Sequence, residues 1–78
     1  MPRFFFDTID QGRLSRDDFG VELPDLDAVR RESVTGAREI LAERIRHGEV
    51  LNGEEFWVRD EAGAVVLKFP LRSVVRGK

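Results

Sequence analysis

The spacing of apolar residues changes at Pro24, and this change constrains the fold more than any other feature of the sequence. Leu23 is expected to be extended, because a residue before proline disfavours the helical conformation. After Pro24, apolar or small residues recur at the spacing of one face of a helix. This stripe consists of Leu26, Val29, Ser33, Ala37, Ile40, Leu41 and Ile45. The sequence therefore predicts one long amphipathic helix that follows an extended first part.

The ends of this helix carry recognisable signals. Asp25 is suited to cap the first turn, and the helix should run to about Arg46. There His47 opposes the negative end of the helix dipole, and Gly48 can adopt the left-handed conformation that stops a helix. Gly36 weakens the helix but would let it lie close to a sheet.

The first part of the chain reads as strands separated by turns. Residues 3–9 are rich in phenylalanine and β-branched residues, which favour a strand, and residues 13–16 form a short second strand. Residues 10–12 and 17–20 contain the aspartate and glycine that are typical of turns. Residues 21–23 are predicted to be extended.

The last third predicts a hairpin around the loop of residues 60–63. A four-residue loop would pair Val58 with Val65, Trp57 with Val66, Phe56 with Leu67, and Glu55 with Lys68. One face would then collect Phe56, Val58, Val65, Leu67 and Phe69. Pro70 ends the strand or marks an edge.

These elements predict an α+β fold in two layers, with a mainly antiparallel four-stranded sheet and one long helix packed on one face. The order is strand, strand, helix, strand, strand. Residues 1–78 form a single small domain, in which 71–78 are expected to be a frayed tail with Val74 and Val75 able to dock. The order of the strands in the sheet stays open.

Composition limits the chemistry of the chain. With 78 residues there is room for one small domain, and the absence of cysteine excludes disulfides, thiolate zinc sites and a cysteine nucleophile. No apolar run approaches the roughly 20 residues of a membrane span or the roughly 7–15 of a signal peptide. We therefore expect a cytoplasmic protein with no membrane partner.

Three segments carry a family resemblance. The start MPRFFF, the segment GVELPDL at 20–26 and the hairpin turn DEAG at 60–63 resemble a family of short bacterial proteins catalogued as a domain of unknown function. The resemblance extends from Met1 to about Val75 and implies no activity. The entry of Leu-Pro-Asp-Leu into a helix is also similar to antitoxin-type partners, which implies a regulatory module as an alternative.

The polar residues indicate structure rather than catalysis. His47, the single histidine, fits a cap at a helix end, and no nucleophile is placed by the sequence to work with it. The acidic side chains that a metal-binding or small-ligand enzyme would use are Asp7, Asp10, Asp17, Asp18, Glu22, Asp25 and Asp27. Their spacing matches no calcium loop. We expect no catalytic residue, no metal and no cofactor, so the protein is not expected to be an enzyme.

Nucleic-acid binding is a second alternative. Phe5 and Trp57 are the kind of aromatic side chains on which bases stack. The cations available for a local patch are Arg13, Arg16, Arg59, Lys68 and Arg72. A pI near 5.4 and the lack of a basic run argue against this function, because phosphate contacts supply most of the affinity.

The first strand is apolar on both faces, although one helix covers only one of them. An apolar patch of Phe5, Ile9, Trp57 and Val66 would remain on the other face. These residues are isolated exposed apolar side chains, or the segment from Leu71 to Val75 covers them, or they form a patch that binds a second copy or another protein. We expect the last of these, in a binding module that acts through protein–protein contacts and forms a homodimer through this face or through an unpaired edge strand.

Overall fold

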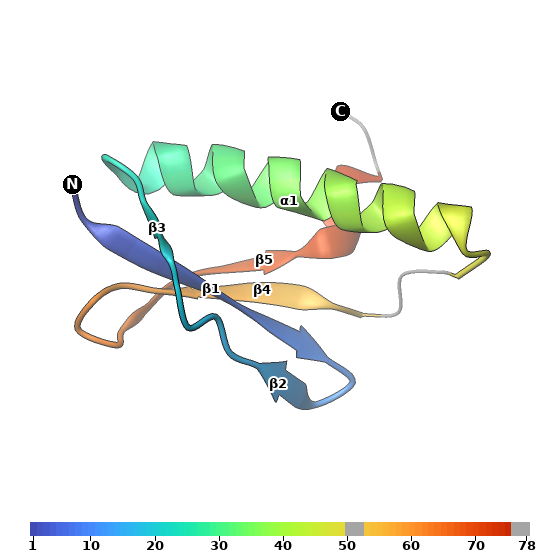
Figure 1. Ribbon diagram of the computed structural model, residues 1–78, viewed down its shortest axis with the longest axis horizontal. Coiled ribbons are helices and arrows are strands. Elements are labelled where there is room, and N and C mark those ends of the chain that lie inside the picture. Colours follow the sequence, from blue (N-terminus) through green and yellow to red (C-terminus); the bar gives the residue numbers. More distant parts are fainter. Residues whose placement is uncertain (50–52, 76–78) are drawn as a thin grey trace.

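The computed structural model describes residues 1–49 and 53–75, and it shows an antiparallel sheet with one long helix across one face (Figure 1). Its elements are β1 (Arg3–Asp10), β2 (Arg13–Ser15), β3 (Val21–Glu22), α1 (Leu26–Arg46), β4 (Glu55–Arg59), β5 (Val65–Pro70) and the 3-10 helix η1 (Leu71–Val74). The predicted two-layer α+β class is thereby confirmed. Neither helix in the described ranges is long and apolar enough to cross a membrane.

The sheet has one strand more than the sequence predicts. Its main order is β2-β1-β4-β5, and β3 pairs with β1 outside this path. β2 pairs only with the last residues of β1, from Thr8 to Asp10. The beginning of the same edge of β1 is therefore open, and Val21 pairs there with Phe4. The segment predicted only as extended thus becomes a fifth strand.

Helix α1 begins and ends where its signals predict. The side chain of Asp25 accepts a hydrogen bond of 2.9 Å from the backbone N–H of Ala28, and Gly48 has a φ of 70° after the last turn. The middle of the predicted stripe is buried. Its end members Leu26 and Ile45 are 50% and 66% exposed, because a helix of 21 residues is about 30 Å long and extends beyond its contacts with the sheet.

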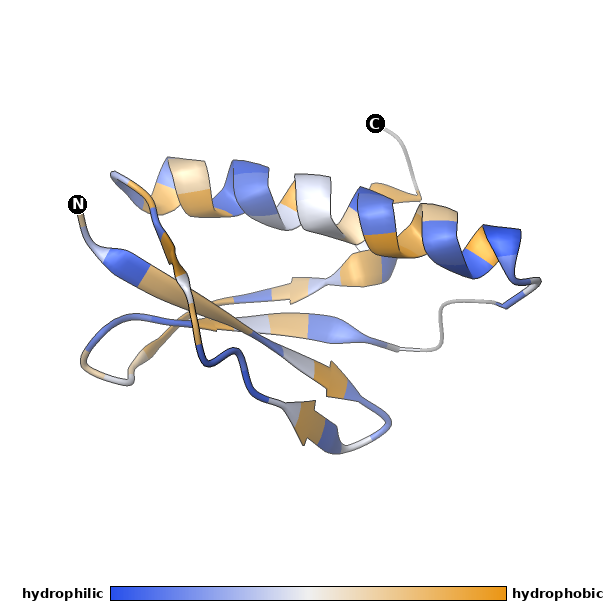
Figure 2. Cartoon of the chain, in the orientation of Figure 1, coloured by the Kyte–Doolittle hydropathy of each residue, from blue (hydrophilic) through white to orange (hydrophobic). Residues whose placement is uncertain are grey.

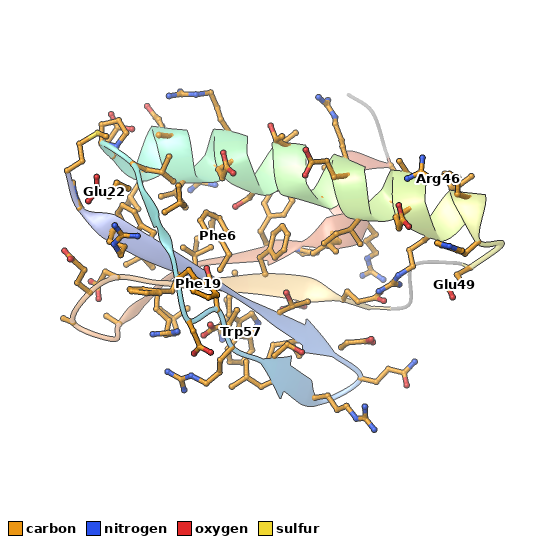
Figure 3. The ribbon with its side chains drawn as sticks, in the orientation of Figure 1. Phe6, Phe19, Glu22, Arg46, Glu49 and Trp57 are labelled. Carbon is orange, nitrogen blue, oxygen red and sulfur yellow. The ribbon has the colours of Figure 1, made fainter. Side chains whose placement is uncertain are left out.

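The core lies between α1 and the sheet. Its buried cluster consists of Phe4, Val29, Ala37, Phe56, Val58 and Leu71. Phe6, which Figure 3 shows between α1 and the sheet, packs edge to face on Phe56 with 5.9 Å between ring centroids. A Cβ atom at Gly36 would lie 3.3 Å from Cζ of Phe56, so the missing side chain does let the helix approach the sheet closely.

The predicted register of the last hairpin is wrong by two residues. Phe56 pairs with Phe69, Val58 with Leu67, and Trp57 with Lys68. One residue of this shift comes from the loop, since five residues rather than four separate Arg59 from its partner Val65, and the other comes from a β-bulge between Val58 and Arg59 that adds Val66 to the opposite strand. A shift of two residues leaves each side chain on its face, so Phe56, Val58, Leu67 and Phe69 still share one side. Val65 and Val66, next to the bulge, are the residues whose predicted faces are wrong.

The segment predicted as a frayed tail begins with the 3-10 helix η1. Leu71 is fully buried at the start of η1, and its backbone N–H donates to the carbonyl of Glu54 over 3.0 Å. Val74 packs against the core cluster, whereas Val75 is 58% exposed. Residues 76–78, the rest of the predicted tail, lie outside the described residues. Figure 2 shows the same distribution, with hydrophobic segments in β1 and in the region of β5 and η1 beneath the helix.

Candidate functional site

The side of the sheet that faces away from α1 is the candidate site, and we refer to it as the outer face. Alternate residues of β1 and β4 project onto it in register, which places Phe5 opposite Arg59, Asp7 opposite Trp57, and Ile9 opposite Glu55. Both α1 and η1 lie on the other side of the sheet (Figure 1). The predicted cover by the residues after Leu71 is therefore not found in the described part of the chain.

Three of the four residues predicted for an apolar patch lie together on the outer face. Phe5, Ile9 and Trp57 are half-buried there on adjacent strands. Val66 is not with them, because the bulge in the last hairpin turns its side chain to the core cluster. Val65, which is 46% exposed, takes the position opposite Arg59 instead.

A cationic side chain lies over each aromatic ring of the outer face. The guanidinium carbon of Arg59 lies 4.8 Å from the ring centroid of Phe5, and Nζ of Lys68 lies 4.3 Å from that of Trp57. Nε1 of Trp57 donates a hydrogen bond of 2.9 Å to Oε1 of Glu55. The outer face is thus an aromatic surface edged by both signs of charge, as protein interfaces commonly are.

Arg59 is fixed in this position by a buried carboxylate. Its Nε and Nη2 atoms donate to the two oxygens of Asp7 over 2.6 and 3.1 Å, and Asp7 is only 3% exposed. Burial favours the neutral form of Asp7, but hydrogen bonds from Arg59 and from the backbone N–H of Asp17 outweigh it and lower the pKa of Asp7. The ion pair between Asp7 and Arg59 therefore holds the guanidinium group of Arg59 in its position over the ring of Phe5.

A second carboxylate, that of Asp17, binds the edge of β1 between the residues that pair with β2 and those that pair with β3. Asp17 accepts hydrogen bonds from the backbone N–H groups of Phe6, Phe19 and Gly20 over 3.0, 3.0 and 3.1 Å. Burial favours its neutral form, yet these three donors lower the pKa of Asp17. The turn also requires glycine at position 20, where φ is 71° and a Cβ atom would lie 2.8 Å from the carbonyl oxygen of Phe4.

This turn presents a feature that our sequence reasoning missed. Phe19 is 85% exposed, more than any other large hydrophobic side chain of the described ranges (Figure 3). Both backbone polar groups of Phe19 are hydrogen-bonded. Its N–H donates to the carboxylate of Asp17, and its carbonyl oxygen accepts a hydrogen bond of 2.9 Å from Nη1 of Arg3. The signal was a large aromatic residue inside a segment otherwise typical of a polar turn.

The remaining candidate residues serve the fold. His47 is the C-cap of α1, and its Nδ1 lies 3.0 Å from the backbone oxygen of Glu43. Asp25 is the N-cap, and Asp7 and Asp17 form the network above. Within residues 1–49 and 53–75 no group of three or more histidine, cysteine, aspartate or glutamate residues is arranged to hold a metal ion.

The cations predicted as a possible nucleic-acid patch do not gather in one place. Arg59 and Lys68 lie on the outer face, and Arg13 and Arg16 are exposed in and just after β2 at the edge of the sheet. Arg72 belongs to η1, which packs with α1 on the opposite side. Two of the five cations therefore flank the aromatic rings.

Comparison with known proteins adds a family and no activity. Searches of the curated proteins and of the solved structures found no match to the chain. Residues 3–72 match the family model DUF6894, a domain of unknown function. This match spans the whole sheet, the helix and the beginning of η1, so the chain belongs to the DUF6894 family.

Proposed function

We propose that this protein is a small binding module that acts through protein–protein contacts rather than catalysis, and that it forms a homodimer through the outer face of its sheet. One observation carries the proposal. The helix and η1 cover the same side, so that within residues 1–49 and 53–75 no helix covers the sheet face that carries Phe5, Ile9 and Trp57 (Figure 1). A two-layer fold with one uncovered apolar sheet face gains stability when that face is buried.

The outer face has the composition of an interface centre. Trp57 and Phe5 supply the large rings that dominate binding energies, and Leu14, half-exposed opposite Ile9, extends the apolar surface onto β2. Glu55 and Lys68 supply opposite charges at its border. A two-fold axis through this face could pair such charges between copies.

The test uses the only tryptophan of the chain as a probe. Solution mass is measured by sedimentation across a wide concentration range, and the emission of Trp57 is recorded on the same samples. We expect a dimer and a blue shift that rises with the dimer fraction, because burial removes water from the indole ring. Trp57→Ala should weaken the dimer tenfold or more.

The matched control is Ile45→Ala, which removes an exposed apolar side chain from the end of α1. This variant should dimerise like the wild type. Circular dichroism of both variants establishes that they are folded. A monomer at every concentration, or equal dimer affinity for Trp57→Ala and the wild type, would contradict the proposal.

Single-stranded nucleic acid is the second candidate ligand, and the cations over Phe5 and Trp57 favour it. Aromatic rings beside cations such as Arg59 and Lys68 on an antiparallel sheet are the parts with which many modules hold unpaired bases. Fluorescence anisotropy with labelled oligouridine at low salt tests this reading. Salt-sensitive binding that Lys68→Gln weakens would support it, and no binding would remove it.

A further inference from the structure

A hollow opens on a different side of the molecule, between α1 and the edge of the sheet formed by β1 and β3. It has a volume of about 230 Å³. The residues that line it are Phe6, Asp17, Gly20, Val21, Glu32, Gly36 and Phe56. Phe6 and Phe56 are rings of the core, and Gly36 contributes no side chain that would fill the space. The hollow therefore exposes aromatic carbon to solvent.

The charge of the lining is of one sign. Asp17 and Glu32 are carboxylates, and the lining contains no lysine, arginine or histidine. The three backbone donors that lower the pKa of Asp17 keep this carboxylate ionised at neutral pH. An occupant with an apolar group and a neighbouring positive charge is the complement of such a site.

Phe19 is not itself a lining residue of this hollow, but it belongs to the same turn as two of them. It lies in the chain between Asp17 and Gly20, which are both lining residues, and its ring is nearly fully exposed. Its backbone is fixed by Asp17 and Arg3, so little backbone entropy is lost when the ring contacts a ligand. A fixed and exposed aromatic residue beside an apolar hollow is typical of an anchor in protein recognition.

We propose that this hollow, with Phe19 beside it, binds an apolar side chain of a partner protein that carries lysine or arginine next to that side chain. The proposal deepens the proposed function, on whose protein-binding character it rests, and it concerns a surface separate from the outer face. Charge complementarity selects the occupant, since an acidic or neutral segment would gain nothing from Asp17 and Glu32.

The experiment titrates isotope-labelled protein with three capped tripeptides and follows backbone amide shifts by nuclear magnetic resonance. The first peptide is Lys-Phe-Arg, the second replaces both cations by glutamate, and the third replaces phenylalanine by alanine. We expect saturable shifts at Gly20, Val21 and Gly36 with the first peptide. The second and third should each bind at least about fivefold more weakly, since exposed charge pairs and apolar contacts have energies of this order.

Two variants test the assignment without disturbing the core. Glu32→Gln and Phe19→Ala change exposed side chains, and each should weaken the first peptide severalfold. Glu39→Gln and Ile45→Ala are the matched controls, because they alter an exposed glutamate and an exposed apolar residue of α1 that do not line the hollow. The controls should bind like the wild type.

Several outcomes would overturn the proposal. These are no shifts with any peptide, equal binding of the cationic and acidic peptides, or shifts confined to the outer face around Trp57. Concentration-dependent shifts at Gly20 and Val21 without peptide would identify a second copy as the occupant. Failure here leaves the sedimentation result for the outer face intact, so the two proposals fail separately.

Discussion

Asp7 joins three parts of the molecule at a single carboxylate. One of its oxygens accepts from the backbone of Asp17, and both accept from Arg59, so β1, the turn after β2 and β4 meet there. A charge this well buried is stable only with its partners in place. The same hydrogen bonds that lower the pKa of Asp7 therefore link the order of the turn to the position of Arg59 over Phe5.

Stability should fall in acid because of Asp7 and Asp17. Both carboxylates have a pKa below the ordinary value of 3.8 in the folded chain, so the unfolded chain binds protons first as the pH falls. Their contribution is complete above the unfolded pKa and is lost as the pH falls from there through the lowered pKa of each group in the folded chain. Urea unfolding followed by Trp57 emission at several pH values measures this loss.

Asp7→Asn isolates one of the two groups. It should lower the free energy of unfolding at pH 7 by roughly 1–3 kcal/mol. An amide at this position accepts hydrogen bonds from Arg59 and from the backbone N–H of Asp17 less well than the carboxylate does. The variant should also show a flatter decline in acid than the wild type. Parallel pH curves for the two proteins would assign the acid sensitivity to other groups.

Gly20 is the residue at which the turn depends on the absence of a side chain. Gly20→Ala should lower the free energy of unfolding by about 3 kcal/mol, from a positive φ and a Cβ atom 2.8 Å from the carbonyl oxygen of Phe4. Gly12→Ala is the control, since Gly12 has a φ of 80° with nothing within 4 Å and should lose only about 1 kcal/mol. Equal losses by urea unfolding would show that the contact with Phe4 relaxes freely.

At the scale of elements, local signals predicted α1 better than they predicted the last hairpin. The helix limits depend on residues next to one another, such as Asp25 at the cap and Gly48 after the last turn. The hairpin register depends on a loop of five residues and on a bulge at Val58 and Arg59, and no residue near the loop signals either feature. Alternation still predicted the shared face of Phe56, Val58, Leu67 and Phe69, because the period of two survives a shift of two residues.

The same distinction applies to the candidate site. Phe5, Ile9 and Trp57 follow from alternation along single strands, so the sequence could predict them. The prediction for Val66 was wrong, because Val66 is the extra residue of the bulge and packs against the core cluster. The pair of Asp7 and Arg59 joins residues 52 positions apart, and it depends on the strand order, which the sequence left open.

The cap of α1 gives a test at this scale. Asp25→Ala should lower the free energy of unfolding by about 1 kcal/mol, because the N–H of Ala28 loses its side-chain acceptor. Asp27→Ala removes a charge from the same first turn without removing the cap, so it should cost about half as much or less. Urea unfolding measures both losses, and a larger loss for Asp27→Ala would show that charge dominates over capping.

At the scale of the whole molecule, the segment after β5 belongs to the domain. Leu71 is fully buried against the core cluster and is tied by its backbone to Glu54, which precedes β4. Glu54 in turn is 3% exposed and pairs with Arg44 near the end of α1. The end of the chain, the end of the helix and the entrance to β4 therefore stabilise one another, and η1 supports the helix-covered side of the sheet.

Leu71→Ala tests whether this last turn is part of the cooperative core. Removing a fully buried leucine side chain should lower the free energy of unfolding by about 2–5 kcal/mol, a large share of the roughly 4–12 kcal/mol expected for a chain this size. Val75→Ala, four residues later and 58% exposed, should leave stability within about 0.5 kcal/mol. Because the outer face lies on the opposite side of the sheet, Leu71→Ala should lower stability without changing dimer affinity at temperatures where it stays folded. Equal, small effects of the two substitutions would mean that the segment after β5 frays in solution and adds little to the core.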